Sequence, residues 1–220
     1  MKKVAVILCG SGYRDGSEIR EAVATLWALS QEHAKVQCFA PDAPQADVVN
    51  CLTGEASASE KRNMLVESAR IARGDVKPLS QMSIADFDAL LIPGGFGAAK
   101  NLCTFASKGS QGTVRPEIEK IIQGFFEKQK PIGAICIAPA ILALSLRGKN
   151  LSLTVGEMGE AAQEIEKCGH KHQATKVTEC HIDSQNKIVT TGAYMFGHAA
   201  LHDIFTGIEN CVRGVLKLTS

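Results

Sequence analysis

The stretch that decides the fold is PIGAICIAPAIL, residues 131–142, an apolar run with a single cysteine in it. Its first part is typical of a buried strand, and from Pro139 onward it is typical of a helix. Cys136 therefore stands where a strand turns into a helix. Such a turn exposes its residue and directs the first helical N–H groups at it, which would lower the pKa of the thiol. The alternative is that Cys136 packs as a small buried hydrophobic side chain.

Strands alternate with helices on both sides of this stretch. We expect strands at 4–9, 35–39, 88–92, 151–155, 179–183 and 187–191, and helices at 17–32, 61–73, 115–128 and 196–218. In the first helix the expected buried stripe is Val23, Leu26, Trp27 and Leu29. Alternation over the whole length predicts one α/β domain, residues 1–220, with a mostly parallel sheet and helices on both faces.

Composition excludes several functional classes. Lys and Arg number 24 and Asp and Glu number 23, a formal net charge of +1, which gives no field to recruit nucleic acid or an anionic membrane. No apolar run is long enough for a secretory signal or a membrane span. The eight cysteines contain no CxxC pair, as expected of reduced thiols, and we expect a cytoplasmic protein.

Ligands of open α/β sheets bind beyond the carboxyl ends of the strands, and two further loops at that edge carry candidate residues. In PGGFG, residues 93–97, consecutive glycines allow backbone N–H groups to approach a ligand closely, as in an oxyanion hole; the alternative is a tight turn. Glu18, in DGSEIREA, either stabilises the start of a helix or serves Cys136 as hydrogen-bond donor or general base. Neither a P-loop nor a GxGxxG fingerprint is present, and we expect no cofactor.

Histidines give no convincing metal site. His198 and His202 stand four residues apart on the last predicted helix, but no third ligand is evident. The cluster around His170 and His172 has no zinc-finger spacing. We expect surface or capping positions for His198 and His202, and a loop and an edge strand for the cluster.

Taken together, the motifs resemble the PfpI and class I glutamine amidotransferase-like superfamily, and within it most closely the ElbB glyoxalase family. The segments that carry this resemblance are GSGYRDGSEIREA, FAPD, LTGE, ESARIARG, DALLIPGGFGAAKNL, FAS, KPIGAICIAPA and KIVTTGAYM. The resemblance implies a flavodoxin-like three-layer sandwich, with Cys136 on a nucleophile elbow and Glu18 as its carboxyl partner. It places anion-stabilising N–H groups near Gly94, Gly95 and Ile137.

The activity that the resemblance implies is cofactor-free conversion of glyoxal, a small dicarbonyl, to glycolate, related to deglycation of early glycation adducts. It also implies a homodimer. Many superfamily members place a histidine after the strand that follows the nucleophile, but here LTV is followed by Gly156 and Glu157. We therefore expect no complete Cys-His-acid triad and a slow enzyme, with Glu157 as a second candidate proton carrier. The alternative function is a redox-sensing or binding protein that uses an oxidisable, low-pKa cysteine.

Overall fold

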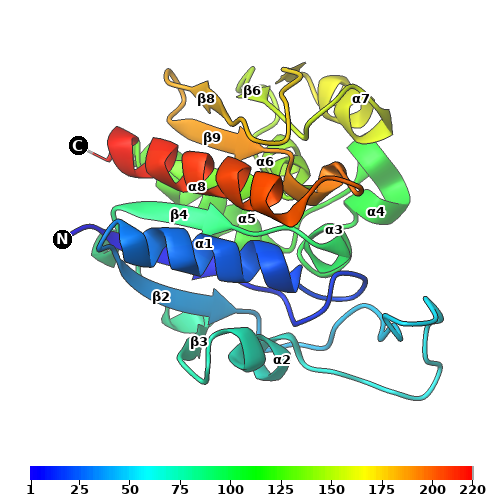
Figure 1. The fold of residues 1–220 in the computed structure, drawn as a ribbon. Coiled ribbons are helices and arrows are strands. Elements are labelled where there is room, and N and C mark those ends of the chain that lie inside the picture. The colour runs from blue at the N-terminus through cyan, green and yellow to red at the C-terminus, as the bar shows by residue number, and fades with distance from the viewer. Residues whose placement is uncertain (220) are drawn as a thin grey trace.

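A seven-stranded sheet forms the centre of the molecule (Figure 1), in a computed structural model that describes residues 1–219. The strand order is β3 (Val76–Pro78), β2 (Lys35–Ala40), β1 (Lys3–Ile7), β4 (Ala89–Ile92), β5 (Ile132–Ile135), β9 (Ile188–Thr191) and β8 (His181–Asp183). Only β8 pairs antiparallel within this sheet. The predicted mostly parallel α/β fold is confirmed.

Helices cover both faces of the sheet and complete three layers (Figure 1). On one face lie α1 (Ile19–Gln31) and α8 (Leu201–Leu218), and on the other α3 (Phe96–Asn101), α5 (Pro116–Glu127) and α6 (Pro139–Ser145). Strand β1 shows why both faces must be covered, since Val4 and Val6 join one core cluster and Ala5 and Ile7 the other. The remaining α-helices are α2 (Met64–Ile71), α4 (Phe105–Lys108) and α7 (Glu160–Lys167), and short 3-10 turns occur at Leu79–Gln81, Ile84–Asp86, Gly109–Gln111 and Ala193–Met195.

Helix α1 buries only part of the predicted stripe, with Leu29 buried and Leu26 half-buried. Ala22, Ala28 and Leu29 are fully buried, whereas Val23 is 45% and Trp27 44% exposed. Small alanines let α1 approach the sheet and α8 closely, and this turns the larger apolar side chains outward. Trp27 packs beside the ring of Phe205 with ring centroids 6.3 Å apart, so its prediction as a core residue is wrong.

Two expected elements differ in extent or place. The strand predicted at 151–155 is short, β6 (Ser152–Leu153), and pairs with β7 (Lys171–His172) in a separate two-stranded sheet. The last helix begins at Leu201 rather than at residue 196. His198 therefore precedes the helix and is exposed, so the i, i+4 histidine pair does not share a helical face. Within residues 1–219 no group of three or more His, Cys, Asp or Glu side chains is arranged to hold a metal ion.

The structure shows no helix, between residues 1 and 219, with both the length and the apolar content needed to cross a membrane. This agrees with the apolar runs in the sequence, which are short and interrupted.

Two buried histidines hold the small sheet in place. His170 accepts the Leu151 N–H at Nδ1 (3.1 Å) and lies 2.9 Å from the Ala143 carbonyl through Nε2, while His172 Nε2 accepts the Val155 N–H (3.3 Å). Burial lowers the pKa of both imidazoles. His170 Nδ1 and His172 Nε2 accept these N–H groups only while they are unprotonated, so the neutral ring is the stabilising form in both residues.

We expect the free energy of unfolding to fall as the pH drops from about 7 towards 5. Both histidines have a lower pKa in the folded protein than in the unfolded chain, where it is about 6.5. The stability that they contribute is therefore present above about pH 6.5 and is lost as the pH falls towards the folded pKa. His172→Gln should weaken this pH dependence and destabilise the protein by about 1–3 kcal/mol through loss of the buried hydrogen bond. Urea unfolding at pH 7.5 and 5 measures both effects. The exposed-residue variant His33→Asn is the control, and an identical pH dependence in both variants would contradict the assignment.

Candidate active site

The predicted sharp turn between a strand and a helix is present at Cys136. The residue follows β5 directly and has φ +62, in the left-handed region that residues other than glycine rarely adopt. Its N–H donates to the Thr191 carbonyl at 2.8 Å, which ties the turn to the neighbouring strand β9. The helix α6 then begins at Pro139, where the missing proline N–H costs nothing.

The Cys136 side chain is only 7% exposed and has three hydrogen-bonding neighbours. The Gly95 and Ile137 N–H groups donate to the sulfur, and the thiol is hydrogen-bonded to the Glu21 carboxyl. Burial, followed by the negative charge of Glu21, raises the pKa of the Cys136 thiol well above its ordinary value, and the two N–H groups only partly offset this. The expectation of a lowered pKa is wrong, because the elbow sits in the interior rather than at an exposed edge.

Glu21 is a fully buried carboxyl at the centre of the site. Its Oε1 accepts the Tyr194 N–H at 3.1 Å and its Oε2 accepts the Gly94 N–H at 3.0 Å. Burial, with a further contribution from the charge of Glu18, raises its pKa to about 8. A carboxyl with a pKa in this range takes up and releases protons near neutral pH, as general acid–base chemistry requires.

Glu18 takes the first of its two predicted roles and stabilises the start of a helix. It is the N-cap of α1, and its Oε2 accepts the Glu21 N–H at 2.6 Å. Burial raises its pKa, and its half-buried side chain lines the cavity beside Cys136. The carboxyl bonded to the thiol, however, is that of Glu21, one helical turn further along α1.

Of the three predicted anion-stabilising amides, two lie at the sulfur and one is used elsewhere. The Gly94 N–H is committed to Glu21, which leaves Gly95 and Ile137 to face an anion at this position. Gly94 and Gly95 must both lack a side chain for their loop to pack this closely against Cys136 and α1. A Cβ on Gly94 would lie 2.5 Å from Cys136 Cβ and 2.7 Å from Glu21 Oε2, and one on Gly95, which has φ +95, would lie 2.4 Å from the Glu18 amide nitrogen.

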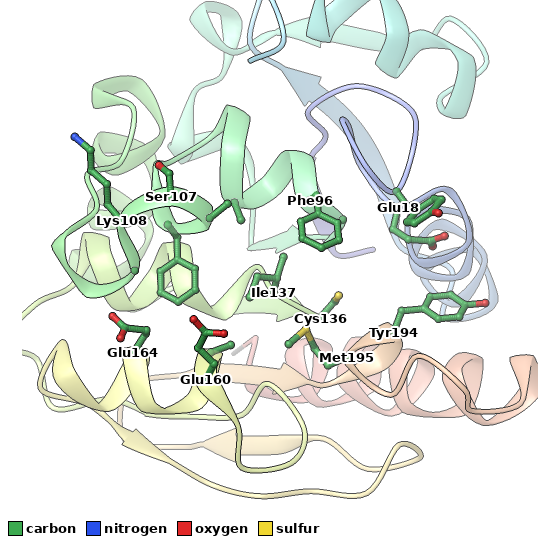
Figure 2. A pocket seen from close by; sticks show the side chains of 17 residues that line it. Glu18, Phe96, Ser107, Lys108, Cys136, Ile137, Glu160, Glu164, Tyr194 and Met195 are labelled. Atoms are coloured by element: carbon green, nitrogen blue, oxygen red, sulfur yellow. The ribbon is translucent and has the colours of Figure 1, made fainter. Parts of the chain in front are cut away.

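Cys136 opens into a cavity of about 660 Å³ (Figure 2). Its lining comprises Tyr13, Glu18, Gly95, Phe96, Ala99, Phe105, Ala106, Ser107, Lys108, Gly109, Cys136, Ile137, Glu160, Ala161, Glu164, Tyr194 and Met195. Glu157 is exposed and is not among these residues, so its prediction as a proton carrier is not supported by its place. No histidine belongs to the lining, in agreement with the expected absence of a triad.

Glu21 is not among the site residues predicted from the sequence, although the sequence contains a pattern that indicates its burial. Glu21, Thr25 and Ala28 follow a helical period and all are buried. The alanines at 22, 24 and 28 mark this face as the one that approaches the core most closely. Glu21 lies on the same face of the helix as these alanines and not on the face of Val23 and Trp27. This position is the sequence feature that indicates a buried carboxyl.

The site and fold agree with comparisons to known proteins. The family model described as DJ-1/PfpI matches residues 2–193. The chain belongs to the DJ-1/PfpI family. Solved structures resemble this chain to different degrees. The crystal structure of an Ehrlichia chaffeensis isoprenoid biosynthesis protein with an amidotransferase-like domain is 36% identical in sequence, with a TM-score of 0.92 and all of both chains covered. Drosophila melanogaster DJ-1beta is 19% identical over 98% of this chain and 96% of its own, with a TM-score of 0.54, and shows the fold alone.

Among curated DJ-1/PfpI-type sequences, a human relative is 47% identical over 99% of this chain and 83% of its own length. It is named glutamine amidotransferase-like class 1 domain-containing protein 3, mitochondrial. A rat relative, named ES1 protein homolog, mitochondrial, is 46% identical over 99% of this chain and 84% of its own. Both names place these relatives in mitochondria, so the cytoplasmic location expected for this chain is not confirmed.

We expect Gly94→Ala to disrupt the site. The added methyl group meets both Cys136 and Glu21, and relief requires backbone movement at the elbow, with a destabilisation of about 1–3 kcal/mol. Urea unfolding measures this cost. Gly197→Ala is the matched control, since a Cβ there meets no atom within 4 Å. Equal stability of the two variants would show that the site tolerates a side chain at residue 94.

We expect Glu21→Gln to lower the pKa of the Cys136 thiol. The amide keeps the size of the side chain but removes the negative charge that disfavours the thiolate. Iodoacetamide alkylation of the Cys136 peptide, followed by mass spectrometry from pH 6 to 11, gives the thiol pKa of both proteins. A wild-type thiol that titrates below the ordinary value of about 8.5 would contradict the structure.

Proposed function

We propose that this DJ-1/PfpI protein is a cofactor-independent glyoxalase that converts glyoxal to glycolate through a hemithioacetal on Cys136. The observation that supports this most directly is the pairing of an elbow thiol with the buried carboxyl of Glu21 at the inner end of a cavity. A nucleophile in contact with a base whose pKa is about 8 is the arrangement that addition to an aldehyde requires.

In the first step the Cys136 sulfur adds to one aldehyde carbon. The thiol proton passes to the Glu21 carboxylate, the C–S bond forms, and the carbonyl electron pair moves onto oxygen. The Gly95 and Ile137 N–H groups, which already point at the sulfur, are placed to stabilise the resulting oxyanion. Return of the proton from Glu21 to this oxygen gives the neutral hemithioacetal.

In the second step a proton moves between the two carbons. The C–H of the hemithioacetal carbon gives its proton to a carboxylate, and the oxygen of the neighbouring aldehyde takes up a proton, which gives an enediol. Protonation of the neighbouring carbon, with loss of the hydroxyl proton from the carbon bonded to sulfur, then yields a thioester and a primary alcohol. Glu18 lines the cavity with a raised pKa and is our candidate for this carrier. Water then hydrolyses the thioester, which releases glycolate and restores the thiol, so no external oxidant or reductant is consumed.

The same geometry predicts a slow reaction. The resting thiol is protonated, because burial raises its pKa and ionisation of Glu21 raises it further. The fraction of molecules with Glu21 ionised is also small at neutral pH, since its pKa is about 8. Both conditions reduce the population that is ready to add to an aldehyde.

The redox-sensing alternative receives no support from the site. Thiols that oxidise readily have a low pKa and are accessible to solvent. Cys136 has a raised pKa and is 7% exposed, the opposite of both properties.

We expect kcat/KM for glyoxal to rise with pH through about pH 8 as Glu21 loses its proton. Glu21→Gln should reduce the rate by about 10²–10⁴-fold and abolish this rise, and Cys136→Ala should abolish turnover. Glu18→Gln should reduce the rate but keep the rise, because the ionising base is still present. Glycolate formation measured from pH 6 to 10 tests these expectations.

The control is Cys51→Ser, which removes an exposed thiol outside the cavity and should leave the rate unchanged. Glycolate formation that persists in a folded Cys136→Ala variant would overturn the proposed function.

A further inference from the structure

The cavity collects aromatic side chains. Aromatic residues make up 5% of the sequence, yet four of them, Tyr13, Phe96, Phe105 and Tyr194, line this one cavity, and they include both tyrosines of the chain. Phe96 is 54% and Tyr13 41% exposed, so these two rings face the outer part of the cavity, together with the exposed polar residues Ser107, Lys108 and Glu160. Faces of aromatic rings attract positive charge, and aromatic-lined cavities recognise ammonium groups in this way.

Three of these rings already hold a cation of the protein on one side. Arg14 lies 5.1 Å from the centroid of Tyr13 and Lys100 lies 5.9 Å from that of Phe96. Arg20 lies 6.0 Å from the centroid of Tyr194 and donates to its hydroxyl at 2.9 Å. Phe105, the first residue of α4, is buried and carries no such cation within residues 1–219.

Carboxylates face the cavity from α7, away from the Glu18 and Tyr194 end (Figure 2). Glu164 accepts the Ser110 N–H at 2.6 Å and pairs with Lys167, interactions that lower its pKa to about 2 and keep it charged. Glu160 is exposed at the start of α7 and makes no ion pair with any residue from 1 to 219. Lys108 belongs to the lining, but Figure 2 shows its ammonium group directed away from the two glutamates.

We infer that Glu160 determines specificity in this cavity, which takes a carbonyl substrate with an aldehyde at one end and a positively charged ammonium or guanidinium group at the other. The aldehyde meets Cys136, the apolar middle of the substrate lies among the rings, and the charged end meets the unpaired Glu160 carboxylate. The aldehyde end of this inference rests on the proposed function, whereas the charge preference does not.

The size of the cavity agrees with a substrate larger than glyoxal. Its volume of about 660 Å³ falls in the range of about 300–1,000 Å³ that accommodates drug-sized ligands. Glyoxal, two formyl groups joined by one bond, would fill only a small part of this volume. Turnover of glyoxal is therefore expected to report the chemistry of the elbow without using the rest of the cavity.

The charge preference is tested without turnover by comparing two thiol reagents of similar size. We expect the trimethylammonium-ethyl methanethiosulfonate to modify Cys136 faster than the sulfonatoethyl reagent, each rate being followed by mass spectrometry of the Cys136 peptide. The exposed Cys51 in the same sample provides the reference ratio. Glu160→Gln should reduce the cation-to-anion ratio at Cys136 by about three- to tenfold and leave that at Cys51 unchanged.

The matched control is Glu127→Gln, which changes the net charge equally. Glu127 is the exposed last residue of α5, just before β5, and so lies at the opposite edge of the sheet from Cys136. The inference is overturned if the ratio at Cys136 does not exceed that at Cys51. The assignment to Glu160 is overturned if both glutamine variants change the ratio equally or neither changes it.

Turnover is then compared for three para-substituted phenylglyoxals that carry a trimethylammonium, a tert-butyl or a carboxylate group. We expect kcat/KM to fall in that order and Glu160→Gln to bring the cationic substrate close to the neutral one. Equal kcat/KM for the cationic and the anionic compound would overturn the inference while leaving the glyoxalase proposal in place. If none of the three nor glyoxal is turned over, the proposed function fails, and the reagent ratio at Cys136 alone decides the charge preference.

Discussion

Burial of the Glu21 carboxyl against the Cys136 thiol would cost several kcal/mol without polar partners to replace water. Three separate segments supply those partners. The loop after β4 gives the Gly94 N–H, the turn after β9 gives the Tyr194 N–H, and the elbow after β5 gives the thiol itself. These segments are adjacent because β4, β5 and β9 are neighbours in a parallel sheet whose carboxyl ends share one edge. The strained backbone at Cys136 and at Ala193, with φ +62 and +41, is part of the same arrangement.

This arrangement determines how the thiol can react. An exposed cysteine at a helix N-terminus would be a thiolate at rest, whereas here burial and a neighbouring carboxylate keep the proton on the sulfur. The proton has one close acceptor, Glu21, and that carboxyl is tuned by burial to a pKa of about 8. Nucleophilicity therefore depends on transfer of a proton within the pair rather than on a permanent charge. A site of this kind keeps the sulfur protonated while it stays buried beside Glu21.

The two ends of the cavity have different structural origins. The Cys136 end is built on the central sheet, where every backbone position is fixed by neighbouring strands. The α7 end belongs to the segment that contains β6 and β7, which lies outside that sheet and is held by buried neutral histidines.

The sequence by itself determined the α/β class, the mostly parallel sheet and the position of the elbow, because these follow from local patterns: short apolar runs, their alternation with helices, and a proline that begins a helix after a cysteine. It also indicated the glycine loop and the first turn of α1 as parts of the site. Only the tertiary structure decided that Glu21 rather than Glu18 contacts the thiol, that the Gly94 N–H is occupied, and that the thiol pKa is raised. These properties depend on the depth of the elbow and on the rotation of α1 about its axis, which is set by how closely its alanines pack and leaves Trp27 outside. Burial and rotation of that kind arise from contacts between distant segments, so no local pattern of residues contains them.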